Sequence, residues 1–164
     1  MQIRTIAPCL WFDDQAEAAA QLYTEVFPDS RITQIARYGK AGQEVHGRPP
    51  GSVMTVAFEL SGHPFTALNG GPLFTFSEAI SFQVSCDTQS DIDYFWERLS
   101  AGGDPKAQQC GWLKDRFGLS WQVVPTVLPE LIGGPDSGRG ERVMTAMLKM
   151  KKIDGGALER AAAG

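Results

Sequence analysis

Apolar and polar residues alternate along this chain with two different periods, one typical of β-strands and one typical of α-helices. The stretch "IRTIAPCLWF" has the composition of a strand, and "DDQAEAAAQLYTEVFP" follows it directly. In the second stretch Ala18, Leu22 and Val26 recur at the spacing of one helical face, and an aspartate stands in front to cap the helix. This part of the chain therefore predicts a strand and then a helix, which Pro28 ends.

Further strands are predicted after this helix, and the same plan then returns. The strands are "SRITQIARYG", "SVMTVAFEL" and "FTALNGG", with a loop rich in Gly and Pro over residues 40–51. Further along, "AISFQVSC" predicts a strand, "TQSDIDYFWERLSAGG" a helix, and "QQCGWLKD" and "LSWQVVPTV" two more strands. Overlaying the halves places Pro8 on Ser81 and Asp14 on Asp87, so the repeat is one of pattern rather than of residues.

These elements predict an α+β fold that consists of two fused β-α-β-β-β modules. We place the first module at about residues 3–72 and the second at about residues 78–128. The chain is long enough for one well-buried core, so we expect a single domain over residues 1–164.

A C-terminal helical extension is predicted at about residues 137–162, outside the repeat. Val143, Met147 and Met150 fall on one stripe of this helix, which predicts that it docks through that stripe. Open sheet edges and a helix rich in methionine leave apolar surface that a second copy would bury. We therefore expect a homodimer.

The composition narrows the possible partners and the compartment. A formal net charge of -4 and a pI near 5.1 leave no extended basic face, so nucleic acid is not an expected partner. No apolar run approaches the length that crosses a bilayer, so we expect no membrane association and a cytoplasmic protein. Cys9, Cys86 and Cys110 lack the spacing of a metal site, and we expect reduced, buried thiols.

Several strings resemble one branch of a known superfamily. They are "PCLWFDDQAEAAAQLYTEVFPDSRI", "SVMTVAFELSGHPFTALNGGP", "EAISFQVSC" and "QCGWLKDRFGLSWQVVPTVLPEL". They are similar to the PhnB-like, 3-demethylubiquinone methyltransferase-like branch of the vicinal-oxygen-chelate superfamily, which includes glyoxalases, extradiol dioxygenases and bleomycin-resistance proteins. The resemblance covers nearly the whole chain and implies that the two modules form a curved, cup-shaped mixed sheet.

The resemblance also implies where a metal ion would be held. In metal-using members, each module supplies one ligand from its first strand and one from its last strand. The overlay of the two halves puts these positions at Pro8, Ala67, Ser81 and Gln122. Only Gln122 offers a plausible donor oxygen, whereas tight sites use imidazole and carboxylate groups. We therefore predict no metal and no cofactor.

A small-molecule site is nevertheless predicted inside the cup. Strand alternation aims Asn69, Ser81, Gln83 and Gln122 inward, and the indole of Trp112 could stack on a flat ligand. The alternative is that these amides bond one another or the backbone. Both interpretations of Gln122 stay open, while the Gly-Gly pair after Asn69 favours a role in capping a turn.

The segment "CGWLKDRFG" carries the remaining candidate chemistry. Lys114 could bind an anionic group and Asp115 could accept a proton, but the composition of a hairpin turn favours a bond from Asp115 to the backbone and solvated charges. Cys110 could be a nucleophile, although an inert thiol is favoured. The other tryptophans are expected in the core, on a helix or on the helix-facing side of the sheet: Trp11, Trp96 and Trp121.

These observations favour a protein that binds a small apolar or aromatic molecule without a metal. The alternative is an enzyme that acts on such a molecule without a metal. The methyltransferase activity in the name of the branch is disfavoured, because the sequence has no glycine-rich turn between a strand and a helix followed by an acidic strand end.

Overall fold

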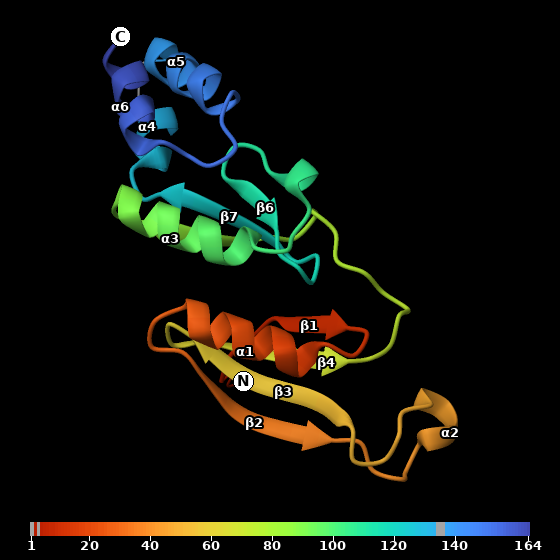
Figure 1. The fold of residues 1–164 in the computed structure, drawn as a ribbon. Helices are drawn as coiled ribbons and strands as arrows, with labels where there is room; N and C mark the ends of the chain where they lie inside the picture. The colour runs from red at the N-terminus through yellow and green to blue at the C-terminus, as the bar shows by residue number, and fades with distance from the viewer. Residues whose placement is uncertain (1, 3, 134–136) are drawn as a thin grey trace. The chain divides into compact units, whose positions relative to one another are not determined.

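The computed structural model describes residue 2 and residues 4–133 and 137–164 of the chain. These residues form two compact units, Met1–Thr75 and Phe76–Gly164, which we describe separately as unit 1 and unit 2 (Figure 1). The boundary between the units falls between the two predicted modules.

Unit 1 has the predicted order of elements. Its strands form one sheet in the order β1-β4-β3-β2, in which β1 and β4 are parallel and the other pairs are antiparallel. A one-turn helix interrupts the loop between β2 and β3. The elements are β1 (Cys9–Phe12), α1 (Ala16–Val26), β2 (Arg31–Arg37), α2 (Gln43–His46), β3 (Val53–Leu60) and β4 (His63–Asn69).

The core of unit 1 lies between its sheet and α1, which runs along one face of the sheet (Figure 1). Small side chains on α1 allow this close packing, since Ala16, Ala19 and Ala20 are all fully buried. Alternate strand residues complete the core, as a sheet with one covered face requires. They are Leu10, Phe12, Val56, Phe58, Leu60 and Ala67.

Unit 2 repeats this arrangement with one strand fewer. Its sheet has the order β5-β7-β6, with β5 parallel to β7 and β6 antiparallel to it. A short 3-10 turn at Pro105–Ala107 stands where the predicted plan has another strand, because a Gly pair and Pro105 follow the helix. The elements are β5 (Phe82–Cys86), α3 (Gln89–Ser100), β6 (Trp112–Lys114) and β7 (Ser120–Pro125).

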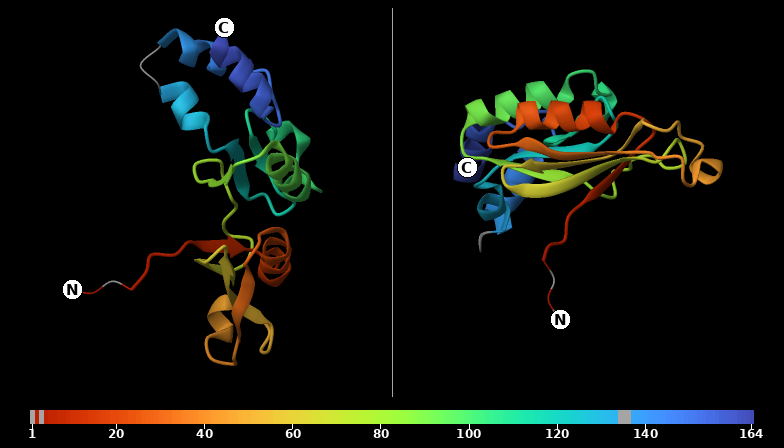
Figure 2. Two further views of the ribbon diagram at one scale, coloured as in Figure 1. Left: turned by 90° about the vertical axis from the view of Figure 1, so that its left-hand side faces the viewer. Right: turned by 90° about the horizontal axis from the view of Figure 1, so that it is seen from below.

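The C-terminal extension consists of several helices rather than one. They are α4 (Leu128–Gly133), α5 (Ser137–Met147) and α6 (Gly155–Ala163), and α5 and α6 lie side by side (Figure 2). Asp154 starts α6, since its side chain accepts a hydrogen bond from the backbone of Ala157 at 2.8 Å. None of the helices in the described part of the chain is long and apolar enough to cross a membrane.

The extension has its own apolar cluster. Leu131, Val143, Ile153 and Leu158 are buried in it, and Met147 and Met150 pack against it together with other apolar side chains. The predicted stripe of Val143, Met147 and Met150 is therefore used in packing, although Met150 follows the end of α5.

Backbone hydrogen bonds attach this extension to the rest of unit 2. The amides of Cys110 and Gly111 donate to the carbonyls of Met150 and Lys151, both at 2.8 Å. The side chain of Gln89 donates to the carbonyl of Ile153 at 3.1 Å, and its oxygen accepts from the amide of Gly155 at 2.9 Å. The extension is thus part of the same folded body as the second sheet.

Candidate functional site

The sheet of unit 2 has one face covered by α3 and a second face on which no other α-helix of the described residues makes a substantial contact. Gln122 pairs with Gln83 on one side and with Trp112 on the other, and Lys114 pairs with Ser120. Side chains of directly paired residues share a face, whereas Trp121 and Val123 alternate to the other side and are buried. We use the name "open face" for the surface formed by Ser81, Gln83, Trp112, Lys114, Ser120 and Gln122.

A chain of hydrogen bonds links three predicted site residues on the open face. The Nε2 of Gln83 donates to Oε1 of Gln122 at 3.2 Å, and Nε2 of Gln122 donates to Oγ of Ser81 at 2.7 Å. The amides therefore bond one another, as the alternative interpretation of these residues requires. A hydroxyl group both donates and accepts, so the hydrogen of Ser81 remains available to a ligand.

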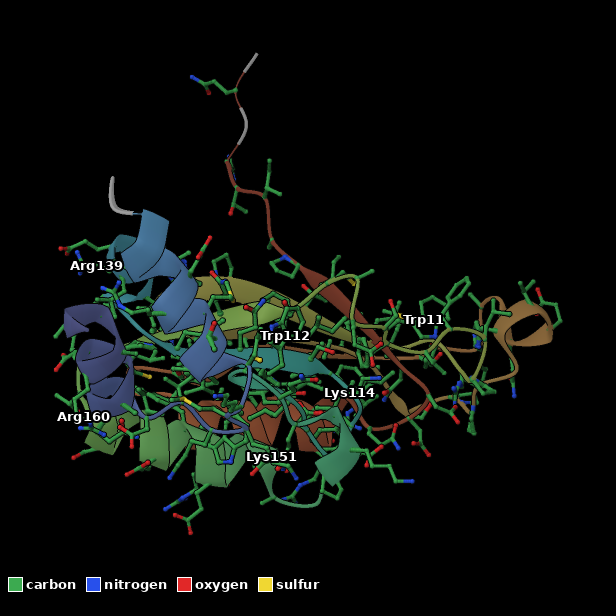
Figure 3. All side chains as sticks on the ribbon, turned by 90° about the horizontal axis from the view of Figure 1, so that it is seen from above. Trp11, Trp112, Lys114, Arg139, Lys151 and Arg160 are labelled. Carbon is green, nitrogen blue, oxygen red and sulfur yellow. The ribbon has the colours of Figure 1, made fainter. Side chains whose placement is uncertain are left out.

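Trp112 and Lys114 lie at the margin of the open face (both labelled in Figure 3). The indole of Trp112 is half-buried. The amine of Lys114 is 2.6 Å from Oε1 of Glu78, so its charge is paired rather than solvated as expected. The hydrogen bond from Lys114 lowers the pKa of the Glu78 carboxyl from its ordinary value.

Asp115 has the structural role that the turn composition predicts. Its Oδ1 accepts hydrogen bonds from the amides of Phe117 at 2.8 Å and Leu119 at 3.0 Å. Its Oδ2 accepts from the indole of Trp121 at 2.9 Å, and the residue is only 2% exposed. The carboxylate thus stabilises the β6–β7 hairpin and is directed away from the open face.

Ser120 lies on the same side of β7 as Gln122, and its hydroxyl group has a property that the sequence does not predict. It is 1% exposed, and its Oγ has no hydrogen-bond partner among the described residues. Buried hydroxyl groups are normally bonded, because an unsatisfied one costs free energy. The alternation Ser120, Gln122, Val124 indicates its face, but no sequence pattern predicts an unpartnered hydroxyl.

Asn69 lies on a different face from the one expected. It pairs with Phe12 and is directed with it toward α1. Its Oδ1 accepts from the first amide of that helix, Ala16, at 2.8 Å, and its Nδ2 donates to the carbonyl of Val53 at 3.1 Å. The prediction that Asn69 aims into the cup is wrong, and the cap it supplies is for α1 rather than for the following turn.

The two metal-ligand positions predicted in unit 1, Pro8 and Ala67, are each one residue away from the equivalent positions in the structure. Ala67 pairs with Leu10 on the buried side of the unit 1 sheet. The pair that corresponds to Gln83 and Gln122 is Cys9 and Thr66, because both pairs join the parallel strands on the uncovered side. The overlay slipped by one residue at Pro8 because it aligned the two helices, whereas the strand-to-helix connection is residues 13–15 in unit 1 and only 87–88 in unit 2.

The corrected positions do not fit a transition-metal site. Two steps before Cys9 the chain has Ala7, so the equivalent set is Ala7, Thr66, Ser81 and Gln122. None of these is an imidazole or a carboxylate, which are the donors that such ions favour. In the described ranges, no three or more His, Cys, Asp or Glu side chains come together in a way that could hold a metal ion.

Trp11 occupies the uncovered face of unit 1, although it was expected against the helix (Figure 3). Its Nε1 donates to the carbonyl of Gly71 at 2.8 Å, and its ring contacts that of Phe74 at 5.0 Å between centroids. The indole lies so close to Gly70 that a Cβ there would come within 2.2 Å of it. The burial of its neighbours Leu10 and Phe12 is the period-two pattern that could have placed it correctly.

The three cysteines are free thiols in different surroundings. Cys9 is exposed, which contradicts the expected burial, while Cys86 is buried and Cys110 is intermediate. Burial raises the pKa of the Cys86 thiol to about 11, so this group is protonated and inert at neutral pH.

Comparison with known proteins agrees with this architecture. The model of a family described as 3-demethylubiquinone-9 3-methyltransferase matches residues 4–124. The chain belongs to this family. A search of curated proteins found no match.

Solved structures support this membership and the glyoxalase-like fold. A putative 3-demethylubiquinone-9 3-methyltransferase, the PhnB protein from Bacillus cereus, is 32% identical over 75% of this chain and 100% of its own, with a TM-score of 0.63. Protein PA1353 from Pseudomonas aeruginosa is 18% identical over 73% of this chain and 96% of its own, with a TM-score of 0.56. The fosfomycin resistance protein FosX from Listeria monocytogenes is 15% identical over 79% of this chain and 98% of its own, with a TM-score of 0.50.

The family's description names a methyltransferase, but the residues of this member do not fit a nucleotide-like methyl donor. Such cofactors are typically held at a glycine-rich turn between a strand and a helix. The connections that lead into the two long sheet-packing helices, α1 and α3, are residues 13–15, "DDQ", and residues 87–88, "DT", and neither contains glycine. The connection from β2 to α2 contains Gly39 and Gly42, but it leads into a helix of one turn. The family match also ends before the C-terminal extension, so α4 to α6 lie outside it.

Proposed function

We propose that this protein binds a small, flat, apolar or aromatic molecule on the open face of unit 2 without the aid of a metal ion. The observation that carries this proposal is the hydrogen-bond chain from Gln83 through Gln122 to Ser81 beside the half-buried Trp112. Sites for small molecules combine an apolar or aromatic surface with a few fixed polar groups, and this face has both.

The groups have complementary roles in this proposal. The ring of Trp112 supplies the flat surface, which favours an offset or edge contact with another ring. Gln122 is held from both sides by Gln83 and Ser81, so its amide keeps one orientation when a ligand approaches. The hydroxyl of Ser81 then donates to an acceptor on the ligand.

Binding is favoured over catalysis by the state of Asp115. This carboxylate is the nearest acidic group along the chain to Trp112, and both of its oxygens accept hydrogen bonds that stabilise the hairpin. A general base needs a free acceptor within reach of the proton it removes. Asp115 does not meet that requirement.

Native mass spectrometry of freshly purified protein tests the proposal. We expect a copurified small molecule that is lost in Gln122→Leu and retained in the control Gln21→Leu, whose side chain is exposed on α1 of unit 1. Both variants should fold, because neither position contributes to a core. Retention of the molecule in Gln122→Leu would assign this glutamine to the packing of the sheet alone.

We also propose a homodimer. Large apolar side chains remain exposed in both units, with Ile6 89% exposed, Leu73 73% and Ile80 68%. Exposed apolar patches of this kind favour association. Light scattering at micromolar concentration should give twice the chain mass, and a clean monomer would contradict this proposal.

A further inference from the structure

Lys114 is the cationic member of the open face, and its position relative to Trp112 is fixed by β6. The two residues are separated by one position of the same strand, so their side chains leave the sheet on the same side. Residues two apart on a strand are about 7 Å apart. This spacing matches a planar ring that carries one charged substituent.

The ion pair of Lys114 is formed with a residue outside the sheet. Glu78 belongs to the irregular segment before β5, and its side chain is 64% exposed, whereas that of Lys114 is 24% exposed. The distance between the amine and the carboxylate is 2.6 Å. Solvent screens such a pair, so another anion that also contacts the sheet can replace the glutamate.

Ser120 is an unused polar group beside Lys114. It is paired with Lys114 across the two strands, and its buried Oγ lacks a partner among the described residues. An anionic oxygen near the lysine amine could accept a hydrogen bond from this hydroxyl, whereas the carboxylate of Glu78 pairs with the lysine and leaves the hydroxyl without a partner. The buried hydroxyl is the second feature that points to a ligand here.

We propose that the molecule bound on the open face is an aromatic anion, such as an aromatic carboxylate, whose ring lies against Trp112 and whose charged group replaces Glu78 on Lys114. This inference rests on the proposed function, because it requires that the open face binds a small molecule. Glu78 then acts as an internal stand-in that holds Lys114 in place until the ligand arrives.

Two probes of nearly the same shape, one anionic and one neutral, test the inference. We would titrate 2-naphthoate and its neutral counterpart 2-naphthamide into 15N-labelled protein and follow the side-chain signals of Trp112, Gln83 and Gln122. The wild-type chain should bind the anion more tightly than the amide. Glu78→Gln should tighten binding of naphthoate about two- to five-fold, the range expected when one exposed ion pair stops competing, and leave naphthamide unchanged.

Variants distinguish a local effect from one of net charge. Lys114→Met should weaken naphthoate about ten-fold or more, because it removes a charge-assisted hydrogen bond, and so abolish the preference for the anion. Glu97→Gln makes the same change of charge as Glu78→Gln, but on α3, which covers the other face of the sheet. It should leave both affinities unchanged.

The outcomes separate this inference from the proposed function. Equal binding of the two probes on the open face, unaltered in Glu78→Gln, would overturn the anionic ligand while leaving a small-molecule site. Tighter naphthoate binding in Glu97→Gln to the same degree would also overturn it, since net charge would then explain the effect. If neither probe moved the three side-chain signals in any variant, both the inference and the proposed function would fail.

Discussion

Asn69 of unit 1 and Gln122 of unit 2 are amide side chains in corresponding strands, and their surroundings differ in almost every respect. Each stands in the strand that pairs in parallel with the first strand of its unit. Asn69 faces the helix, where both ends of its amide bond the backbone. Gln122 faces away from the helix and bonds only side chains, those of Gln83 and Ser81.

This contrast shows how the face of a sheet decides the role of an amide. Beneath a helix, an amide must satisfy backbone groups that water cannot reach, and it becomes part of the fold. On a face without a helix, an amide is held by neighbours of its own kind and remains accessible. The type of residue is the same in both places, so only its position along the strand separates structure from candidate function.

The largest expected difference between the units comes from the C-terminal extension, which packs only on unit 2 among the contacts described. Deleting the residues after Gly138 removes Val143, Ile153 and Leu158 from a buried cluster. Each such side chain contributes about 1.5–3 kcal/mol of hydrophobic stabilisation. Hydrogen exchange should show lost protection in unit 2 and retained protection in unit 1.

The substitution Leu148→Ala serves as a control for this deletion, because Leu148 is exposed in the same extension. It should leave the melting temperature nearly unchanged. An unchanged melting curve in the deleted chain would mean that the extension contributes nothing to the stability of unit 2.

The two amides themselves give the next largest difference. Asn69→Ala removes the cap of α1 and the hydrogen bond to the carbonyl of Val53, which should cost about 2–3 kcal/mol of unfolding free energy. Gln122→Ala should cost less than about 1 kcal/mol, because its partners can turn to water. Urea denaturation of the two variants measures both changes in unfolding free energy. Equal losses would contradict the view that Asn69 stabilises the fold more than Gln122 does.

The cysteine thiols on the first strand of each unit should differ in reactivity toward alkylating agents. Cys9 in β1 is exposed, whereas Cys86 in β5 is buried and has a pKa raised to about 11 by burial and by nearby carboxylates. At pH 8 only about one Cys86 thiol in a thousand is ionised, and the thiolate is the reactive form. Brief treatment with iodoacetamide followed by mass spectrometry should find Cys9 modified and Cys86 intact.

The same pKa predicts a loss of stability in alkali. The Cys86 thiol ionises near its ordinary value of 9.0 in the unfolded chain and at about 11 in the folded one, so ionisation favours unfolding between these values. The contribution of Cys86 is fully present below pH 9 and decreases as the pH rises toward 11. Thermal melts of the wild type and Cys86→Ala across this range should converge if the thiol is responsible.

The smallest expected effect is that of Gln122→Glu on metal content. The substitution adds one carboxylate to the four corrected metal-ligand positions. The other three are Ala7, Thr66 and Ser81, so the set would contain a single strong metal donor, whereas tight sites use three or four. Elemental analysis after extensive dialysis should find no stoichiometric zinc, nickel, iron or manganese in the variant or in the wild type. Near one metal per chain in the wild type would overturn the assignment of these positions.

Period-two alternation correctly predicted that Gln83 and Gln122 share one face of the unit 2 sheet, because the strands there are short and regular. Trp112, which was chosen for its indole rather than by alternation, pairs with Gln122 on that face. The same reasoning failed in unit 1, where the assumed positions in β1 and β4 were one residue away from the uncovered face, so that Ala67 and Asn69 lie on the helix side. A one-residue slip exchanges the two faces of a strand, and the overlay of two weakly similar halves has no means of detecting it.

Other features could not be predicted from the sequence, because they depend on contacts between residues that no periodic pattern relates. Glu78 lies in a segment without regular structure and forms an ion pair with Lys114 of β6. No periodic pattern relates the two positions, so the sequence does not predict this ion pair. The extension was predicted as one helix because its apolar stripe continues through Met150, although the Asp-Gly-Gly of residues 154–156 starts a new helix. The helix cap at Asp154 therefore decides where the last helix begins, although the apolar pattern alone suggests one continuous helix.

The attachment of the extension has a consequence for the solubility of the chain. β6 is an outer strand of its sheet, and unpaired amides beside such a strand invite pairing with another molecule and the growth of aggregates. The amides of Cys110 and Gly111, just before β6, are instead taken by Met150 and Lys151 of the same chain. We expect the extension to protect this margin, so that the deleted chain scatters light at concentrations where the full chain stays clear.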